Sequence, residues 1–165
     1  MKTFSHTWLV AMTGIILSAA PNFSAQKEAP MTAHATGAFE VKLTPQPPDD
    51  KSADTTIARC TLDKQFHGNL EGTSQGQMLA ASTGVKGSGG YVAIEHVTGT
   101  LAGRTGSFTL QHSGTMKGGT FHLEITVVPD SGTGQLKGLS GSMAIQIAPD
   151  GKHSYDFTYS VPKTD

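Results

Sequence analysis

The chain has 165 residues, of which 36% are hydrophobic and 15% are charged, and this composition excludes a highly charged disordered chain. Twelve basic and 13 acidic residues give a net charge of -1, which provides no electrostatic footprint for nucleic acid or an anionic membrane surface. Eighteen of the 20 glycines lie between Gly68 and Gly151. Such spacing suits a single β domain with tight turns and is poor material for long helices.

The N-terminus has the three-part layout of a secretory signal peptide. Lys2 supplies the positive charge, residues 8–17 form an apolar run, and small residues follow at 18–20. We expect a signal peptide over residues 1–25, with cleavage after Ala20 or Ala25, and a disordered leader over residues 26–35. The protein is then periplasmic or secreted and has no membrane association after the signal is removed. An N-terminal membrane anchor or a buried helix is the alternative.

The folded domain is expected over residues 36–162, with turn residues separating eight candidate strands. These strands cover residues 39–43, 57–66, 70–81, 91–101, 107–116, 121–128, 135–147 and 153–161. Alternation with period two dominates them, and no segment after residue 25 shows a sustained helical period. Many short strands of even spacing indicate a barrel or a sandwich, and closure removes exposed edges. We therefore predict an all-β fold, a single antiparallel eight-stranded closed barrel. In the seventh strand the apolar residues cannot all lie on one face, because their alternation shifts by one residue after Leu136. This shift predicts a bulge near Gly138.

The cross-strand register of two hairpins can be predicted from the glycines in their turns. A type II′ turn prefers glycine first, which places Gly103 and Arg104 at the turn between the fourth and fifth strands. This register sets Glu95 directly opposite His112. A second turn at Lys117 and Gly118 sets His112 opposite Leu123, and both registers gather the apolar residues on one face.

Several segments together resemble the bacterial domain of unknown function 3224 family. They are residues 61–68, 70–74, 103–108, 111–114, 128–134 and 138–141, within a resemblance that covers residues 37–162. The resemblance implies a small barrel similar to that of allene oxide cyclase, a plant isomerase. It implies no established activity and assigns no catalytic residues. Members of the family are mostly cytoplasmic domains, so the signal peptide is a departure.

Glu95 and His112 are the candidate catalytic residues. Glu95 lies in period with apolar neighbours on its strand, so its carboxylate is expected on the lumen face, where desolvation would raise its pKa. A carboxylate that holds an imidazole is the basic unit of general acid–base catalysis. It is equally a buried polar pair that satisfies itself or orients a ligand, and we favour that second interpretation.

The sequence predicts a barrel that binds a small, largely apolar ligand in its lumen, without a cofactor. The expected ligand-binding residues are Tyr91, Glu95, Phe108, Leu110, His112, Tyr155 and Tyr159. An isomerase or cyclase acting on a small lipid-like substrate through Glu95 and His112 is the alternative, and association into a homo-oligomer is a third possibility. No metal is expected, since His96, His122, Glu124 and His153 form no close metal-ligand signature. Cys60 is expected to be a small buried hydrophobe.

Overall fold

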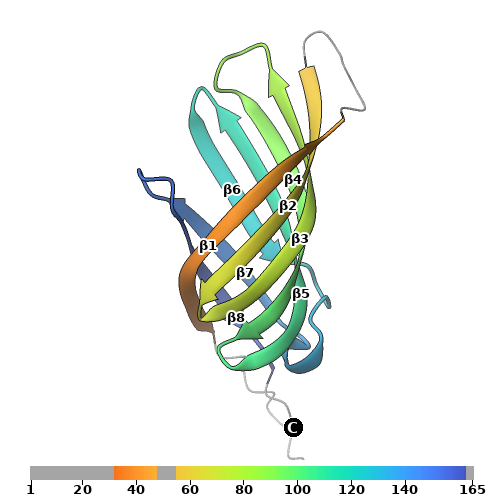
Figure 1. Cartoon of the computed structure of the whole chain (residues 1–165), viewed down its shortest axis with the longest axis vertical. Helices are drawn as coiled ribbons and strands as arrows, with labels where there is room; N and C mark the ends of the chain where they lie inside the picture. The colour runs from red at the N-terminus through yellow and green to blue at the C-terminus, as the bar shows by residue number, and fades with distance from the viewer. Residues whose placement is uncertain (1–31, 48–54, 163–165) are drawn as a thin grey trace, which may run out of the picture.

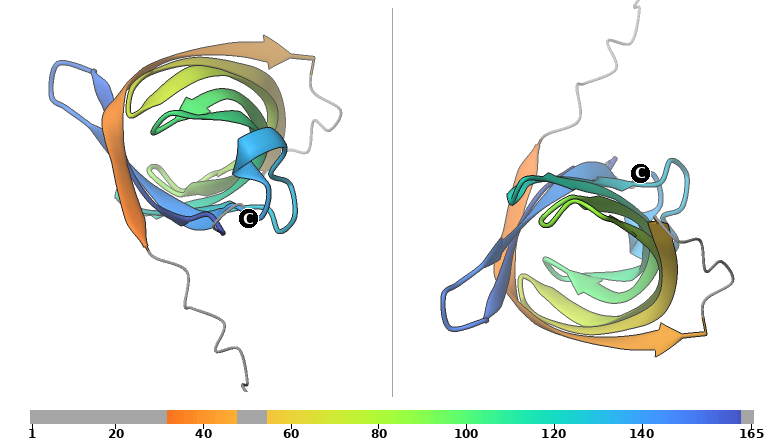
Figure 2. Two further views of the ribbon diagram at one scale, coloured as in Figure 1. Left: turned by 90° about the horizontal axis from the view of Figure 1, so that it is seen from below. Right: turned by 90° about the horizontal axis from the view of Figure 1, so that it is seen from above.

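The computed structural model describes residues 32–47 and 55–162, which form a closed barrel of eight antiparallel strands (Figures 1 and 2). The predicted all-β closed barrel is confirmed. The expected signal peptide and most of the expected leader lie outside the described residues. In chain order the strands are β1 (Ala33–Gln46), β2 (Thr55–Gly68), β3 (Leu70–Thr83), β4 (Gly89–Leu101), β5 (Arg104–Lys117), β6 (Thr120–Val127), β7 (Ser140–Ile147) and β8 (His153–Ser160), with a short 3-10 helix, η1 (Gly134–Leu136), between β6 and β7.

Each strand turns alternate side chains into the lumen, as the period-two pattern predicts. On β8, Tyr155, Phe157 and Tyr159 are buried while Asp156 is exposed. Strand β1 begins at Ala33, ahead of the expected start at Thr36, and Ala35 is fully buried. The barrel closes because β1 pairs with both β2 and β8.

The end of the barrel that is lower in Figure 1, where η1 lies, contains a cluster of buried side chains. Its core is a continuous cluster of aliphatic and aromatic side chains, among them Phe66, Leu70, Val97, Leu101, Phe108, Leu110, Phe157, Leu136 and Leu139. The last two belong to η1 and the turn after it, which cover this end and are joined to β5 by a hydrogen bond from the Thr133 N–H to the Ser107 carbonyl. The lower half of the lumen is therefore filled largely by the side chains of this cluster.

The η1 segment corrects the predicted seventh strand. Strand β7 begins at Ser140 instead of residue 135, and Gly138 lies in the connecting turn with a φ of 77°. The shift in the apolar alternation arises because residues before Ser140 are not part of the sheet. Leu136 and Leu139 are instead buried at the end of the barrel. A bulge at Gly138 is not needed to explain the shift.

The predicted hairpin registers are wrong by two residues. The turn between β4 and β5 consists of Ala102 and Gly103, with φ values of 47° and 84°. Positive φ at both central residues is the type I′ geometry, which matches the strand twist and here outweighs the preference for glycine first. Glu95 is therefore opposite Leu110, and His112 is opposite Ala93.

The next hairpin is shifted in the same sense. Its turn residues are Gly118 and Gly119, and His112 is paired with Ile125 instead of Leu123. A shift of two residues keeps every side chain on its predicted face, because side chains alternate with period two. The lumen-facing set is thus as expected although the cross-strand partners are not.

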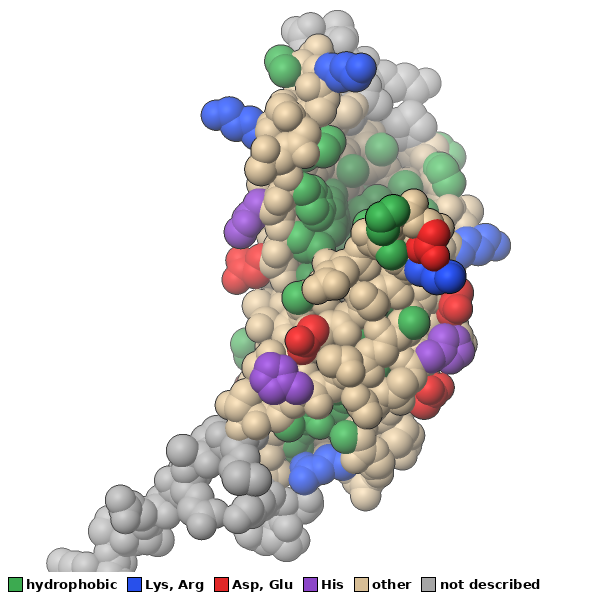
Figure 3. Space-filling view, turned by 90° about the vertical axis from the view of Figure 1, so that its left-hand side faces the viewer, with side chains coloured by type: hydrophobic (Ala, Val, Ile, Leu, Met, Phe, Trp, Pro, Cys, Tyr) green, Lys and Arg blue, Asp and Glu red, His purple; other side chains and the backbone are tan. Residues whose placement is uncertain are grey.

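The barrel wall has a seam between β6 and β7. These strands share one paired position, Thr126 with Ser142, and they diverge above it (Figure 1). On its other side β6 is paired with β5 as far as the hairpin turn. Figure 3 shows a hollow lined with hydrophobic side chains on the side of the barrel where these strands lie.

Hydrogen exchange tests the seam. Alternate amides of an antiparallel strand point to opposite neighbours, so half of those in residues 120–125 face β5 and half face the seam. We expect the seam-facing amides to exchange much faster than the amides facing β5. In β3, which is paired on both sides, both sets should be protected. Uniform protection along β6 would show that the seam is closed in solution.

Candidate functional site

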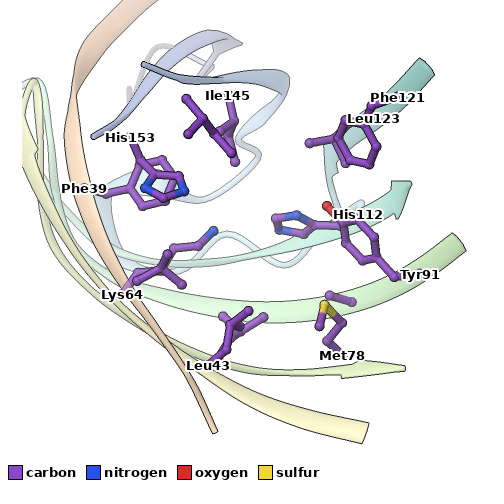
Figure 4. Close-up of a pocket in the computed structure, with 14 residues that line it drawn as sticks. Phe39, Leu43, Lys64, Met78, Tyr91, His112, Phe121, Leu123, Ile145 and His153 are labelled. Carbon is purple, nitrogen blue, oxygen red and sulfur yellow. The ribbon is translucent and has the colours of Figure 1, made fainter. Parts of the chain in front are cut away.

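The upper half of the lumen encloses a cavity of about 590 Å³, within the range of small-molecule sites (Figure 4). Its lining is mostly aliphatic and aromatic. The lining residues are Phe39, Val41, Leu43, Leu62, Lys64, Met78, Tyr91, Ala93, His112, Phe121, Leu123, Ile145, Ile147 and His153. All eight strands contribute, so the cavity is part of the barrel lumen.

Glu95 is buried beneath this cavity and is the centre of a polar cluster. Its side chain has no exposed surface. The Lys64 ammonium donates a hydrogen bond to Glu95 Oε2 over 2.7 Å, and the Ser74 hydroxyl donates to Oε1. His112 Nε2 lies 2.9 Å from Oε2, but its N–H is not aligned with that oxygen, so this contact is electrostatic. Four neighbouring strands, β2 to β5, each contribute one member of the cluster.

The backbone register explains how these groups meet. Lys64 is paired with Ser74 across β2 and β3, and Gly76 is paired with Glu95 across β3 and β4. A Cβ atom at Gly76 would lie 2.3 Å from the Ile94 carbonyl oxygen and 3.2 Å from Glu95 Cβ. The glycine therefore lets β4 approach closely at the point where the carboxylate enters the cluster.

The predicted contact between Glu95 and His112 is present, although the two residues are not directly opposed. Leu110 is the direct partner of Glu95, and His112 lies two positions farther along β5. Diagonal neighbours of this kind lie within reach of long side chains on the same face of a sheet. The interaction therefore survives the error in register.

The cluster keeps Glu95 ionised, so the raised pKa that was expected from desolvation alone is wrong. Burial by itself raises the pKa of this carboxyl group, but contact with His112, the charge and hydrogen bond of Lys64 and the hydrogen bond of Ser74 together lower it to about 2. Lys64 is also largely buried, with 8% of its surface exposed. Its ammonium lies 4.9 Å from the centre of the Phe39 ring and 5.6 Å from that of Phe66, distances at which cation–π attraction is favourable.

Lys64 is the member of the candidate site that the sequence interpretation missed. It lies in period with Leu62 and Phe66, both buried, so the alternation itself placed it on the lumen face. A lysine on an apolar face is unusual unless it is paired. This position, in alternation with buried residues, was the signal that could have identified Lys64. Its partner, Glu95, lies on β4, two strands away.

The predicted ligand-binding residues fall into two groups. Tyr91 and His112 line the cavity, while Glu95 lies beneath it. The others belong to the packed lower half: Phe108, Leu110, Tyr155 and Tyr159. The Tyr155 hydroxyl accepts a hydrogen bond from the Leu70 N–H at 2.9 Å and donates one to the His67 carbonyl, which is a structural role.

Two aromatic contacts shape the upper cavity. Tyr91 and Phe121 stack with ring centres 6.4 Å apart, and Phe121 is 54% exposed. The Tyr91 ring occupies the space left by Gly114, where a Cβ atom would lie 2.3 Å from Tyr91 Cε1. Burial and the Glu95 charge raise the pKa of Tyr91, so its hydroxyl stays protonated at neutral pH. His153, which sequence reasoning assigned to no site, lies against the Phe39 ring with centres 5.0 Å apart.

The described residues contain no group of three or more potential metal-binding side chains. His122 and Glu124 are exposed on the outer face of β6, and Cys60 is partly buried. Within residues 32–47 and 55–162 there is also no helix long and apolar enough to span a membrane.

These features define a class of small antiparallel β-barrel whose lumen is solid at one end and hollow at the other, with a buried ion pair beneath the hollow part. Residues 35–159 match the model of a family described as protein of unknown function (DUF3224), and the chain belongs to that family. A solved structure of a protein of unknown function from the same family, from Shewanella oneidensis MR-1, is 49% identical to this chain. It covers 81% of this chain and 100% of its own, with a TM-score of 0.77. No curated protein matches the sequence.

The low pKa of Glu95 predicts an acid-dependent loss of stability. Its folded pKa of about 2 lies below its ordinary value of 4.5, so the unfolded chain binds the proton more readily. The contribution to the free energy of unfolding is complete above pH 4.5 and is lost as the pH falls toward 2. It amounts to on the order of 3 kcal/mol.

Urea unfolding at a series of pH values measures this contribution. The difference in free energy of unfolding between the wild type and Glu95→Gln should shrink as the pH falls from about 5 to 2. Glu124→Gln, on the outer face of β6, is the matched control and should show little change. A difference that is independent of pH would contradict the ionised state of Glu95.

Proposed function

We propose that this protein binds a small, largely apolar ligand in the upper half of its barrel lumen. The observation that carries the proposal is the cavity of about 590 Å³, apolar in most of its lining and closed below by a packed core. Apolar side chains around a space of this size make fewer contacts than those of a filled core, and a bound apolar molecule supplies such contacts.

The seam between β6 and β7 supports a route of entry. Phe121 and Leu123 on β6 and Ile145 and Ile147 on β7 line the cavity beside it, and Ile147 is 65% exposed. A ligand entering there would meet apolar side chains from the surface to the floor. Entry of a ligand would not require a long series of backbone hydrogen bonds to break, because β6 and β7 share one paired position.

Binding is better supported than catalysis. The alternative of an isomerase or cyclase requires Glu95 to reach open volume beside a substrate. Glu95 has no exposed surface and does not line the cavity. Of the two candidate catalytic residues, His112 alone borders the cavity, with Glu95 behind it, so the pair is better suited to orienting a ligand.

A cavity-filling variant tests the binding site. Met78→Trp combined with Leu123→Trp adds two bulky rings to the lining. Leu79→Trp combined with His122→Trp places the same rings on the outer faces of the same strands, where the native side chains are exposed. We expect the first variant to lose roughly tenfold or more in affinity for the apolar probe N-phenylnaphthylamine, measured by fluorescence titration, because its volume is reduced.

The outer-face variant should retain the wild-type affinity. Equal affinities in the wild type and both variants would place the probe outside the lumen and contradict the proposal. Circular dichroism of each variant confirms that the barrel is intact before the titration.

We also propose that the protein acts outside the cytoplasm. The support is the N-terminal pattern of Lys2, the apolar run of residues 8–17 and the small residues that follow. When the full chain is expressed, cell fractionation should find the protein in the periplasm or medium, shortened by about 25 residues. A chain lacking residues 1–25 should stay in the cytoplasm. Recovery of the full chain uncleaved from the cytoplasm would contradict export.

A further inference from the structure

We propose that the floor of the cavity recognises an uncharged carbonyl oxygen, so that the ligand is an apolar molecule whose inner end carries a ketone, ester or amide group. This inference rests on the proposed function. It deepens it by assigning Lys64 and His112 as a pair of convergent hydrogen-bond donors, and by naming the chemical class that such a pair selects.

The Lys64 ammonium has more N–H donors than the described residues accept. A lysine ammonium carries three N–H donors. Across the part of the chain that the structure describes, its one hydrogen-bond acceptor is Glu95 Oε2, and its other close neighbours are the faces of Phe39 and Phe66. Because Lys64 lines the cavity, an oxygen placed there would meet an unused donor. Figure 4 shows its side chain directed into the cavity toward His112.

His112 supplies the second donor. Its Nε2 atom is buried and lacks an aligned hydrogen-bond partner among the described residues, although Glu95 Oε2 is 2.9 Å away. Glu95 Oε2 carries negative charge 2.9 Å from Nε2, which favours a hydrogen on Nε2 over a second centre of negative charge there. A buried N–H without an aligned acceptor is costly, and the ring that bears it borders the cavity.

The two donors are close enough to share one acceptor. Lys64 Nζ and His112 Nε2 lie 2.7 Å and 2.9 Å from the same atom, Glu95 Oε2, so they are at most 5.6 Å apart. An oxygen can lie about 2.9 Å from two donors whenever their separation is below about 5.8 Å. A single carbonyl oxygen with its two lone pairs meets this requirement from the cavity side.

The charge balance favours an uncharged ligand. Glu95 is ionised, and Lys64, the only lysine or arginine in the lining, already neutralises it. A ligand carboxylate would add a second negative charge next to Glu95 with one lysine between them. Burying an uncompensated charge is far more costly than burying a carbonyl group that accepts two hydrogen bonds.

Three probes of similar length distinguish these chemistries: methyl decanoate, decanoate and decane. At about 30 Å³ for each methylene-sized group, the share of one water molecule, all three fit the cavity. We expect calorimetric titration of the protein to show methyl decanoate binding at least about tenfold more tightly than decanoate. Decane should bind through apolar contacts alone.

Two variants assign the donors. His112→Phe keeps a planar ring and should lower the affinity for methyl decanoate about tenfold while leaving decane unchanged. His96→Phe makes the same substitution on the exposed outer face of β4 and is the control. The second variant, Lys64→Met with Glu95→Gln, removes both charges together so that neither is left unpaired, and should produce a similar loss. Its control is Lys117→Met with Glu124→Gln on exposed positions.

The outcomes distinguish recognition of a carbonyl group from binding of an apolar ligand in general. Tighter binding of decanoate than of its methyl ester would overturn the uncharged class in favour of a carboxylate. Ester affinity that neither variant changes would overturn carbonyl recognition while leaving an apolar binding site in place. Failure of all three probes to bind would contradict the proposed function itself.

Discussion

The buried carboxylate of Glu95 is the constraint on which the rest of the barrel depends. A charge without exposed surface must be compensated, and Lys64, Ser74 and His112 meet it from three other strands. Removal of one partner would leave an uncompensated buried charge, a change that typically costs 3–5 kcal/mol. The cluster therefore fixes β2, β3, β4 and β5 relative to one another at mid-height in the lumen.

The Glu95 cluster divides the lumen into two parts that differ in how side chains fill them. Below the cluster, large side chains such as Phe66, Phe108 and Phe157 fill the barrel, and η1 covers its end. Above it, the lumen contains the cavity, and β6 and β7 share one paired position beside it. Most of the fully buried large side chains therefore lie below the cluster, and the cavity lies above it.

Much of this arrangement could be predicted from the sequence, because it depends on alternation. Period two assigned Glu95 and His112 to one face, and a register error of two residues left that assignment intact. The turn at Ala102 could not be predicted, since a positive φ at alanine is unfavourable in isolation and is imposed here by the strand twist.

Two further features depend on tertiary packing and escaped sequence reasoning. The η1 segment carries strand-like apolar residues, Leu136 and Leu139, which are buried by the barrel end instead of by a sheet partner. The boundary between the packed and hollow halves depends on how side chains from eight strands fill one lumen. For that reason Phe108 and Tyr159 were expected to line the cavity, whereas Phe39 and Lys64 line it instead.

The central claim is that the upper lumen is a binding site whose floor is set by the Glu95 cluster. A crystal structure of the protein grown with methyl decanoate tests it most directly. It should show the chain of the ester along the upper lumen, with its carbonyl oxygen within hydrogen-bond distance of both Lys64 Nζ and His112 Nε2. An upper lumen that stays free of the ester, with Phe121 and Leu123 turned inward to fill it, would contradict that claim.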